Sequence, residues 1–356
     1  MDAHAVVSSR SWKIALALTL AVALGGVPAQ AQQDPQAQRL EETQAQRQQV
    51  QPGNNAPVWR EVRREGEHFT TIKGPEAGVL IHSLGQTWRE IRNAWIVPIV
   101  GWLIVIAACA IGLFHWGHGP VRLEDKPTGR LIRRFTTVQR VAHWGLAISS
   151  CILAVSGLIM LVGKHVLLPV IGYTLFSWLA EISKGLHNFV GPVFAASAVL
   201  MIVVFVRDLL PAAGDLGWIL KVGGLLSGGR LPAGKHHAFH KLWFWGSVVI
   251  LSTIISATGL VLDFPTFEQT RAVMIVMNIV HAVAAGLLMA LSVTHIYMGT
   301  RGVEGAYEGM RYGYVDETYA KEHHVYWYED VKAGKVETEM AEGTPEAPQV
   351  LQAARS

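Results

Sequence analysis

Five long apolar stretches constrain the fold of this chain more than any other feature. Each has about twenty residues or more, which as a helix rising about 1.5 Å per residue can cross a hydrocarbon core of roughly 30 Å. Inside a bilayer every backbone polar group must be bonded within its own segment, so helices are predicted. The stretches lie near residues 95–114, 141–162, 187–206, 243–262 and 274–298. A shorter run, 167–180, cannot span and is expected at the interface. The sequence therefore predicts an all-α integral membrane protein with five transmembrane helices.

Composition supports this class. Of 356 residues, 51% are hydrophobic and 16% are charged, whereas soluble chains carry about 25% charged residues. The net charge is only +3 and the basic residues lie in loops, so nucleic acid is not an expected partner. Cys109 and Cys151 are isolated in apolar stretches and are interpreted as packing residues. Without a CxxCH motif, c-type haem attachment is excluded, and a cysteine-based metal site is not favoured.

The N-terminus has the features of a secretory signal. Arg10 and Lys13 precede an apolar run, and Ala29-Gln30-Ala31 forms an A-x-A cleavage site. Residues 1–31 are therefore predicted to be a signal peptide, with an uncleaved anchor helix as the alternative. Cleavage would leave the mature chain starting outside the cytoplasm.

The remaining polar regions flank the spans. Residues 32–57, rich in Gln, Ala and Pro, are predicted to be a disordered linker. Residues 58–94 mix strand-like and helical pieces and are predicted to form a small periplasmic segment. The Glu/Pro/Ala-containing C-terminus, 331–356, is predicted to be disordered.

Loop charge predicts the orientation, because Lys and Arg concentrate in cytoplasmic loops. The loop after the first span and the loop at 207–241 are both strongly basic, whereas the loop at 263–271 carries one Arg against Asp263 and Glu268. The N-terminus is therefore expected in the periplasm and the C-terminus in the cytoplasm, which agrees with a cleaved signal.

With this topology, four histidines in the spans fall at two depths. His281 and His295 are fourteen residues apart on one helix, about 21 Å along its axis, and within roughly 40° of each other around it. His187 starts the third span from the outside, and His143 starts the second from the inside. We call His187 and His281 the outer pair, and His143 and His295 the inner pair. Histidine in a membrane helix usually marks function, and haem iron takes axial imidazoles, so two bis-histidine b haems are predicted.

A histidine metal site is the competing interpretation, but such sites usually also recruit carboxylates, which these spans almost lack. Basic residues at span ends are candidates for haem propionates or for simple interfacial anchoring: Arg140, Lys184, Arg207 and Arg301. Three glycines could admit a porphyrin face or allow close helix packing: Gly157, Gly191 and Gly286.

The amino-acid sequences of these motifs resemble those of a known family. The stretches RRFTTVQRVAHWGLAISSCILAVSGLIML, KGLHNFVGP, HKLWFWGSVVILSTIISATGL and IVHAVAAGLLMALSVTHIYMGTRGVEGAYEGM are similar to the gamma subunit of respiratory formate dehydrogenase. The resemblance covers roughly residues 130–330. It implies a four-helix di-haem cytochrome b bundle with a cytoplasmic tail, with the four histidines as ligands. The span at 95–114 is then an extra transmembrane helix, as in the longer gamma subunits of that family.

The resemblance also implies partners. Electrons would arrive from a periplasmic molybdenum or tungsten alpha subunit through an iron–sulfur beta subunit and leave to a membrane quinone near the inner haem. The chain would sit in the bacterial inner membrane. It would be a subunit of a formate:quinone oxidoreductase without a formate-oxidising site of its own, since it has no molybdopterin-type or cluster-ligand motif.

One departure from the family concerns the quinone pocket. The loop before the fourth span usually carries an amide-rich sequence ending in Gln-Lys. Here His237 and His240 precede Lys241. Imidazoles can hydrogen-bond a quinone carbonyl and relay protons, so these three residues are candidates for the pocket, with a basic surface loop as the alternative.

Two alternative functions remain at this point. The chain could be the cytochrome b subunit of another respiratory complex, such as a hydrogenase or a thiosulfate reductase, which would share the bundle and the ligands. It could also be a membrane anchor or transporter without redox function, which difference spectra would distinguish.

Overall fold

The computed structural model describes residues 68–69, 79–81, 84–221, 231–267, 269–345 and 347–350. The expected signal peptide and linker, residues 1–57, lie outside the described residues. The chain divides into two units. The first comprises Met1–Trp95 and Thr266–Ile275. Its described elements are β1 (His68–Phe69), which pairs antiparallel with β2 (Val79–Ile81), and α4 (Leu84–Glu90). Strands and a helix were both expected in this segment.

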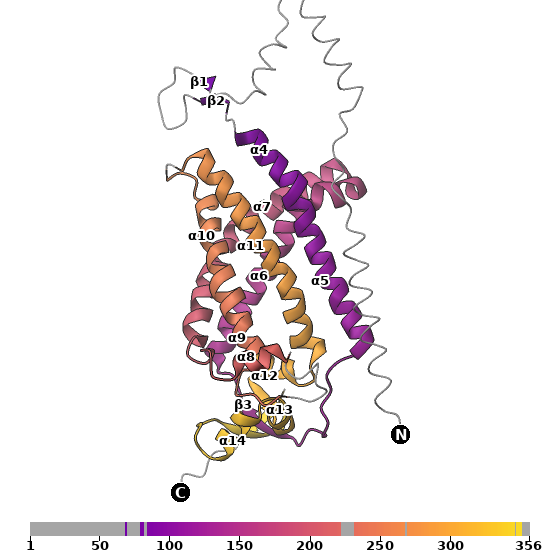
Figure 1. Cartoon of the computed structure of the whole chain (residues 1–356), viewed down its shortest axis with the longest axis vertical. Coiled ribbons are helices and arrows are strands. Elements are labelled where there is room, and N and C mark those ends of the chain that lie inside the picture. Colours follow the sequence, from indigo (N-terminus) through magenta and orange to yellow (C-terminus); the bar gives the residue numbers. More distant parts are fainter. Residues whose placement is uncertain are drawn as a thin grey trace, which may run out of the picture. The chain divides into compact units, whose positions relative to one another are not determined.

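Five helical segments among the described residues are long and apolar enough to cross a membrane, in agreement with the five predicted spans. They are Leu84–His118, Thr137–Val166, Leu168–Phe205, Ala238–Asp263 and Arg271–Gly302. The last four correspond to the predicted bundle. In Figure 1 the helices α6, α7, α10 and α11 of the second unit run alongside one another.

The extra helix, α5 (Val97–His118), follows π-helix η1 (Ile91–Ile96) and packs on α11 (Arg271–Tyr297). Val100 is buried, and a Cβ placed on Gly286 would lie 2.8 Å from its side chain. Further along, His115 Nδ1 lies 2.9 Å from Tyr297 Oη. Of the two roles considered for Gly286, the structure therefore shows close helix packing.

Helices α6 (Thr137–Val166) and α7 (Leu168–Phe205) form the first hairpin of the bundle. The side chain of Thr136 accepts a hydrogen bond from Gln139 N, and Gln139 Oε1 accepts one from Thr136 N, so a capping box fixes the start of α6. The run at 167–180, which was expected at the membrane interface, forms the beginning of α7. The backbone at Gly172 is not helical and has a φ of 75°, which suits glycine, so α7 consists of two helical stretches joined at a bend. The stretch after the bend is long enough to cross a bilayer core of roughly 30 Å.

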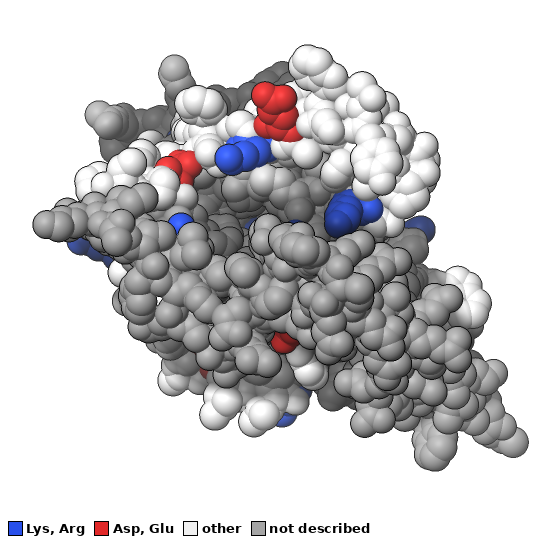
Figure 2. All heavy atoms as spheres, turned by 90° about the horizontal axis from the view of Figure 1, so that it is seen from above, with Lys and Arg blue, Asp and Glu red and all other residues white. Residues whose placement is uncertain are grey.

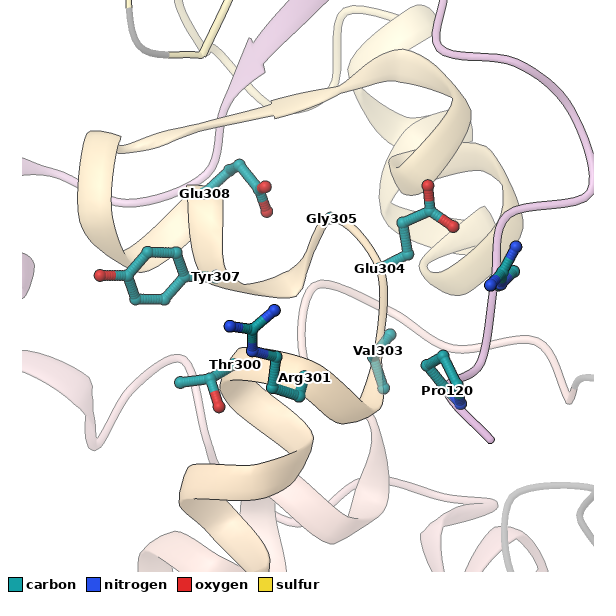
Figure 3. A pocket seen from close by; sticks show the side chains of 9 residues that line it. Pro120, Thr300, Arg301, Val303, Glu304, Gly305, Tyr307 and Glu308 are labelled. Carbon is teal, nitrogen blue, oxygen red and sulfur yellow. The ribbon is translucent and has the colours of Figure 1, made fainter. Parts of the chain in front are cut away.

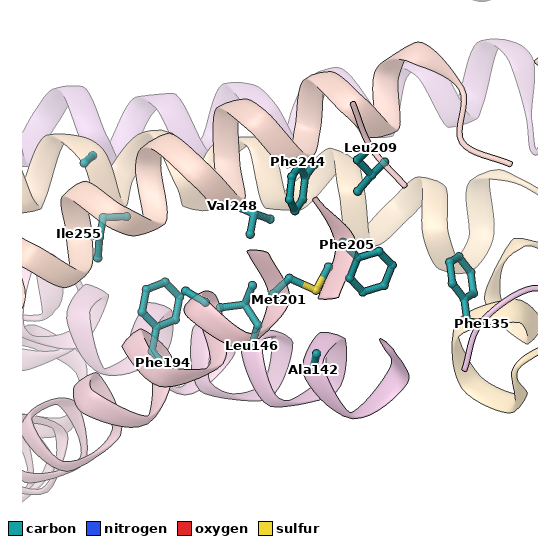
Figure 4. Packing of buried hydrophobic residues seen from close by; sticks show 12 residues of the cluster. Phe135, Ala142, Leu146, Phe194, Met201, Phe205, Leu209, Phe244, Val248 and Ile255 are labelled. Atoms are coloured by element: carbon teal, nitrogen blue, oxygen red, sulfur yellow. The ribbon is translucent and has the colours of Figure 1, made fainter. Parts of the chain in front are cut away.

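The second hairpin combines α9 (Ala238–Trp243), π-helix η3 (Phe244–Leu251) and α10 (Ser252–Asp263) with α11, which continues into π-helix η4 (Met298–Gly302). A cluster of buried apolar side chains joins the two hairpins. Leu146 of α6, Phe194 and Met201 of α7, and Phe244 of η3 pack together in it (Figure 4). This core fixes the helices that carry the four histidines.

The tail folds against the end of the bundle where α8 (Asp215–Leu220) and α9 lie (Figure 1). It contains α12 (Ala306–Tyr312), α13 (Glu317–His323) and α14 (Val325–Lys332). A four-stranded antiparallel sheet accompanies them, in the order β4 (Tyr314–Asp316), β3 (Arg130–Arg133), β5 (Met340–Thr344) and β6 (Ala347–Val350).

This sheet corrects two expectations. The chain is mostly helical but not all-α, and the stretch 331–356, expected to be disordered, contains two strands. The composition of β5 is polar and gives no strand signal. It is held by a partner distant in sequence, since Leu131 pairs with Ala341, and both are buried. Single-segment patterns do not reveal such a pairing.

Candidate functional site

The outer pair meets between α7 and α11. The rings of His187 and His281 have centres 6.2 Å apart and planes inclined by 73°. The two residues are separated by 94 positions in the sequence, and only the packing of the hairpins brings them together. The structure therefore brings together the two histidines that were paired by depth.

A hydroxyl group holds each ring of the outer pair. Ser156 Oγ lies 2.9 Å from His187 Nδ1, and Thr258 Oγ1 lies 3.0 Å from His281 Nδ1. Both hydroxyls donate their own proton to a carbonyl one turn earlier, Ser156 to Leu153 O and Thr258 to Ile254 O. Each hydroxyl must then accept the bond, so both imidazoles carry their proton on Nδ1. Nε2 is left as the nitrogen with a free lone pair, which is the form that binds a metal.

Glycine follows each of these hydroxyl residues and makes room for the ring. A Cβ on Gly157 would lie 3.3 Å from His187 Cε1, and a Cβ on Gly259 would lie 3.1 Å from His281 Cε1. Any larger residue would press on the imidazole. The same pair of residue types, hydroxyl then glycine, thus serves one histidine from α6 and the other from α10.

The inner pair meets between α6 and α11. The rings of His143 and His295 also have centres 6.2 Å apart, with planes inclined by 51°. Trp243 of α9 stacks on His295, with ring centres 4.5 Å apart and planes within 2°. His143 Nδ1 is buried and has no hydrogen-bond partner among the described residues. The inner pair thus has the same ring spacing as the outer pair, but different side chains surround its rings.

Both pairs fit an axial haem site. An imidazole nitrogen binds a metal at about 2.0–2.1 Å, which puts the ring centre roughly 3 Å from the metal and two opposed rings about 6 Å apart. Within the described residues, no group of three or more His, Cys, Asp or Glu could hold a metal ion. A haem needs only two axial ligands from the protein, because the porphyrin supplies the others. The donor set therefore suits haem better than a protein-only metal site.

The three residues expected at the quinone pocket lie in one place but in different surroundings. His237 and Lys241 line a cavity of about 530 Å³, together with Trp218 of α8. His240 is stacked behind His237, with ring centres 3.6 Å apart. Lys241 forms an ion pair with Asp215, since its Nζ lies 2.9 Å from Asp215 Oδ2. Burial lowers the pKa of His237 to about 3, with the cation of Arg134 acting in the same direction.

A second cavity, of about 380 Å³, lies beyond the end of α11. Arg301 and Glu308 extend into it from two sides (Figure 3). Arg301 had been considered for a haem propionate, and it follows His295 by less than two turns. By contrast, the guanidinium of Arg140 donates a hydrogen bond to Arg311 O in the tail.

Several residues around the histidines were not identified from the sequence alone. They are Ser156, Thr258, Gly259, His236 and His324. One signal was available: the pairs Ser156-Gly157 and Thr258-Gly259 repeat within two of the apolar spans. No local signal pointed to His324, because its contacts come from a loop ninety positions away.

Comparison with known proteins agrees with this geometry. Residues 134–310 match the family described as prokaryotic cytochrome b561. The cytochrome b556(Fdn) subunit of the nitrate-inducible formate dehydrogenase of Escherichia coli K12 is 27% identical over 225 residues, which cover 60% of this chain and 98% of that protein. The cytochrome b556(fdo) subunit of the same organism is 27% identical over 56% of this chain and 93% of its own length.

A further relative is the formate dehydrogenase cytochrome b556 subunit of Haemophilus influenzae, 25% identical over 62% of this chain and 91% of that protein. The matched region holds all four histidines and the two hairpins that position them. Haem b is the group that this family implies, and the two imidazole pairs suit it. The helical bundle therefore matches the prokaryotic cytochrome b561 family, and the chain is similar to the membrane cytochrome b subunits of formate dehydrogenase.

Proposed function

We propose that this chain carries electrons across the bacterial inner membrane from an iron–sulfur beta subunit of formate dehydrogenase to a membrane quinone. The alpha subunit, with molybdenum or tungsten, would oxidise formate, and this chain alone would not. The observation that carries the proposal is that two imidazole pairs of equal spacing lie at two levels of one helix, α11.

The residues of each pair have separate tasks. His187 and His281 would hold an outer b haem, and their Nδ1 hydrogen bonds fix the tautomer before the cofactor binds. His143 and His295 would hold an inner one, with Trp243 restricting the ring of His295. Haem supplies reversible one-electron transfer. The apolar core between the hairpins keeps the two levels about 21 Å apart along α11.

The orientation follows from charge. The basic loops at 119–136 and 207–241 adjoin the end of the bundle that carries α8, α9 and the tail. Figure 2, viewed from the top of Figure 1, shows both acidic and basic side chains among the described residues of that face. Placing the basic end in the cytoplasm puts the N-terminus in the periplasm and the outer pair towards the partner subunits.

Quinone would bind beside the inner pair. The cavity lined by Trp218, His237 and Lys241 is within the usual size range of ligand sites, roughly 300–1,000 Å³. Leu216 and Leu220 of α8 are exposed next to it, so an apolar tail has a surface to lie on. A lysine held by Asp215 and a buried imidazole are both able to bond a quinone carbonyl.

Haem content measured on single variants tests the ligand assignment. We expect two haems b per chain in the purified protein, measured by haem quantification and by reduced-minus-oxidised spectra. H187A or H281A should remove mainly the outer haem, and H143A or H295A mainly the inner one. H165A, at an exposed position near the end of α6, is the matched control and should keep both. Two haems remaining in a ligand variant would remove that residue from the assignment.

The subunits that co-purify with the chain test the partner assignment. An iron–sulfur subunit with a molybdenum or tungsten subunit that reduces the haems on addition of formate is the expected result. Haems that hydrogen reduces, or that thiosulfate re-oxidises, through the co-purifying partners would instead assign the chain to another respiratory complex.

A further inference from the structure

Four imidazoles gather at the end of the bundle, and they come from two distant segments. His236, His237 and His240 lie at the start of α9, and His324 lies between α13 and α14 of the tail. The ring of His240 is 3.6 Å from that of His237, 5.9 Å from that of His236 and 6.4 Å from that of His324, measured between centres. We call these four residues the imidazole cluster.

Two members of the cluster are buried and two are half-buried, yet their ring nitrogens are not all satisfied. His236 is 8% exposed and His324 is fully buried. Among the described residues, His236 Nε2, His240 Nδ1 and His324 Nε2 have no hydrogen-bond partner. Buried polar atoms in native proteins are nearly always paired with protein or ordered water, so three unpaired imidazole nitrogens in one cluster call for a chemical reason.

Specific contacts hold the tail onto the α9 loop. His324 Nδ1 donates to Gly234 O at 2.7 Å, and Tyr326 N donates to Ala233 O at 3.1 Å. Arg134, from the segment before α6, donates to Lys235 O at 2.8 Å. Because Nδ1 of His324 is the donor, its Nε2 is an acceptor that faces the buried cluster without a bond. The tail thus contributes one member of the cluster in a defined tautomer.

The cluster lies between the cavity and the inner pair. His236 and His237 line the cavity from which solvent or quinone would approach. His240 and Trp243 are three residues apart on α9 and therefore share one face of the helix, and Trp243 stacks on His295. His240 of the cluster is therefore one helical turn away from Trp243, which packs on the predicted haem ligand His295.

We propose that the imidazole cluster, completed by His324 of the tail, delivers the protons for quinone reduction. This inference rests on the proposed quinone-reducing function. Formate oxidised by the partner subunits supplies two electrons, and quinone takes up these electrons with two protons to give quinol. Each imidazole gives a proton from one ring nitrogen towards the quinone and takes one on its other nitrogen from the cytoplasmic side. A ring that relays in this way changes tautomer, and rotation of the ring restores its starting tautomer before the next proton. His324, whose Nδ1 stays bonded to Gly234 O, takes up and releases its proton at Nε2.

The charges around the cluster favour neutral rings, which can pass protons by exchanging tautomers. Burial lowers the pKa of His236, His237 and His324, and the guanidinium of Arg134 lowers it further. The two lysines near the cluster are paired, Lys235 with Asp208 and Lys241 with Asp215. The charged and titratable groups facing the cluster from all neighbouring elements are Arg134, Asp208, Asp215, Lys235, Lys241, Tyr319 and His323.

Amide substitutions in the intact complex separate proton delivery from structure. In H324N the amide nitrogen takes the place of Nδ1 and keeps the bond to Gly234 O, but the second ring nitrogen is lost. H236Q removes a second member of the cluster independently. H165N, at the exposed end of α6, is the control for the same change of residue type.

Three measurements are made on the complex in liposomes: haem content, the rate at which formate reduces the haems without quinone, and the rate of formation of a short-chain quinol. We expect H324N and H236Q to keep their haems and their haem reduction rate. Quinol formation should fall at least about tenfold. Its solvent deuterium isotope effect should rise, because proton delivery becomes limiting. H165N should match the unaltered complex.

The outcomes separate the proton-delivery role of the cluster from the proposed quinone-reducing function on which it rests. Quinol formation at the unaltered rate in both variants would overturn the proton-delivery role. If H324N loses its haems, its contribution is structural and H236Q decides the question. If formate fails to reduce the haems or the quinone in the unaltered complex, the proposed function itself fails, whatever the variants show.

Discussion

Thr258 Oγ1 lies 3.0 Å from His281 Nδ1 while donating its own proton to Ile254 O at 2.7 Å. His281 Nδ1 is also 3.1 Å from Ile255 O, a carbonyl that can only accept. Both neighbours therefore require a proton on Nδ1, and the ring presents an unprotonated Nε2. The bundle selects the metal-binding tautomer by hydrogen bonding alone, and Ser156 does the same for His187.

The first prediction concerns the haem potentials. A hydrogen bond from Nδ1 makes the ligand more basic and stabilises the oxidised iron. The outer haem, whose ligands both have such bonds, should then have a lower potential than the inner haem, where His143 Nδ1 has no partner among the described residues. This order favours electron flow inwards.

T258V tests this relationship, because valine keeps the shape of threonine without the hydroxyl. The potential of the outer haem should rise and that of the inner haem should stay, in a redox titration followed optically. S252A, in α10 but bonded to Ser247 O rather than to a histidine, is the control. Equal shifts in both haems, or none, would contradict the assignment.

The second prediction concerns the glycine beside His281. G259V would place a Cβ 3.1 Å from His281 Cε1 and add two methyl groups to it, so the ring must move. We expect the outer haem to be lost preferentially from the purified protein, with the inner haem retained. G185V is the control: it lies two residues from His187, but nothing is within 4 Å of its Cβ position. Full haem content in G259V would show that the ring does not need this space.

The third prediction concerns topology. A reporter that is active only in the periplasm should work when fused near residue 90 and should be silent near residue 320. The physical reason is the concentration of basic residues in the loops that adjoin the tail. The reverse pattern would invert the proposed direction of electron flow.

The fourth prediction concerns pH. Burial, reinforced by Arg134, lowers the pKa of His237 to about 3, from about 6.5 in an unfolded chain. Between these values the unfolded state binds more protons, so stability falls as the pH falls through that window. His236 and His324 are shifted in the same direction.

Limited proteolysis can follow this loss, because the tail is held to the α9 loop by His324. The tail should become more sensitive to protease at pH 5 than at pH 7.5, before the haems are released. R134M, which removes the cation beside the cluster, should weaken this difference. Equal protection at both pH values would show that the cluster does not control the docking of the tail.

The sequence was sufficient for the spans and for the pairing of the four histidines. Length and hydropathy decide which segments cross a membrane, and depth alone matched His187 with His281 and His143 with His295. The distance between the members of each pair could not be predicted. It depends on how Leu146, Phe194 and Phe244 pack between the hairpins.

Other features depended on contacts that no single segment reveals. The strand Met340–Thr344 has little strand propensity and exists because Leu131 and Ile132 offer it an edge. The burial of His324 follows from a bond to Gly234, ninety positions earlier. The early start of α7 was missed because the run at 167–180 was considered by itself, as a stretch too short to span a membrane.

Helix α11 supplies one histidine to each pair, and it is the last of the five candidate spans in the described part of the chain. During synthesis, neither pair can form until this helix has left the ribosome and entered the membrane. The first four spans by themselves hold His143 and His187 without their partners. If the two pairs bind haem as proposed, cofactor binding is a late event in biogenesis, and a chain truncated before α11 would have no bis-histidine site at either level.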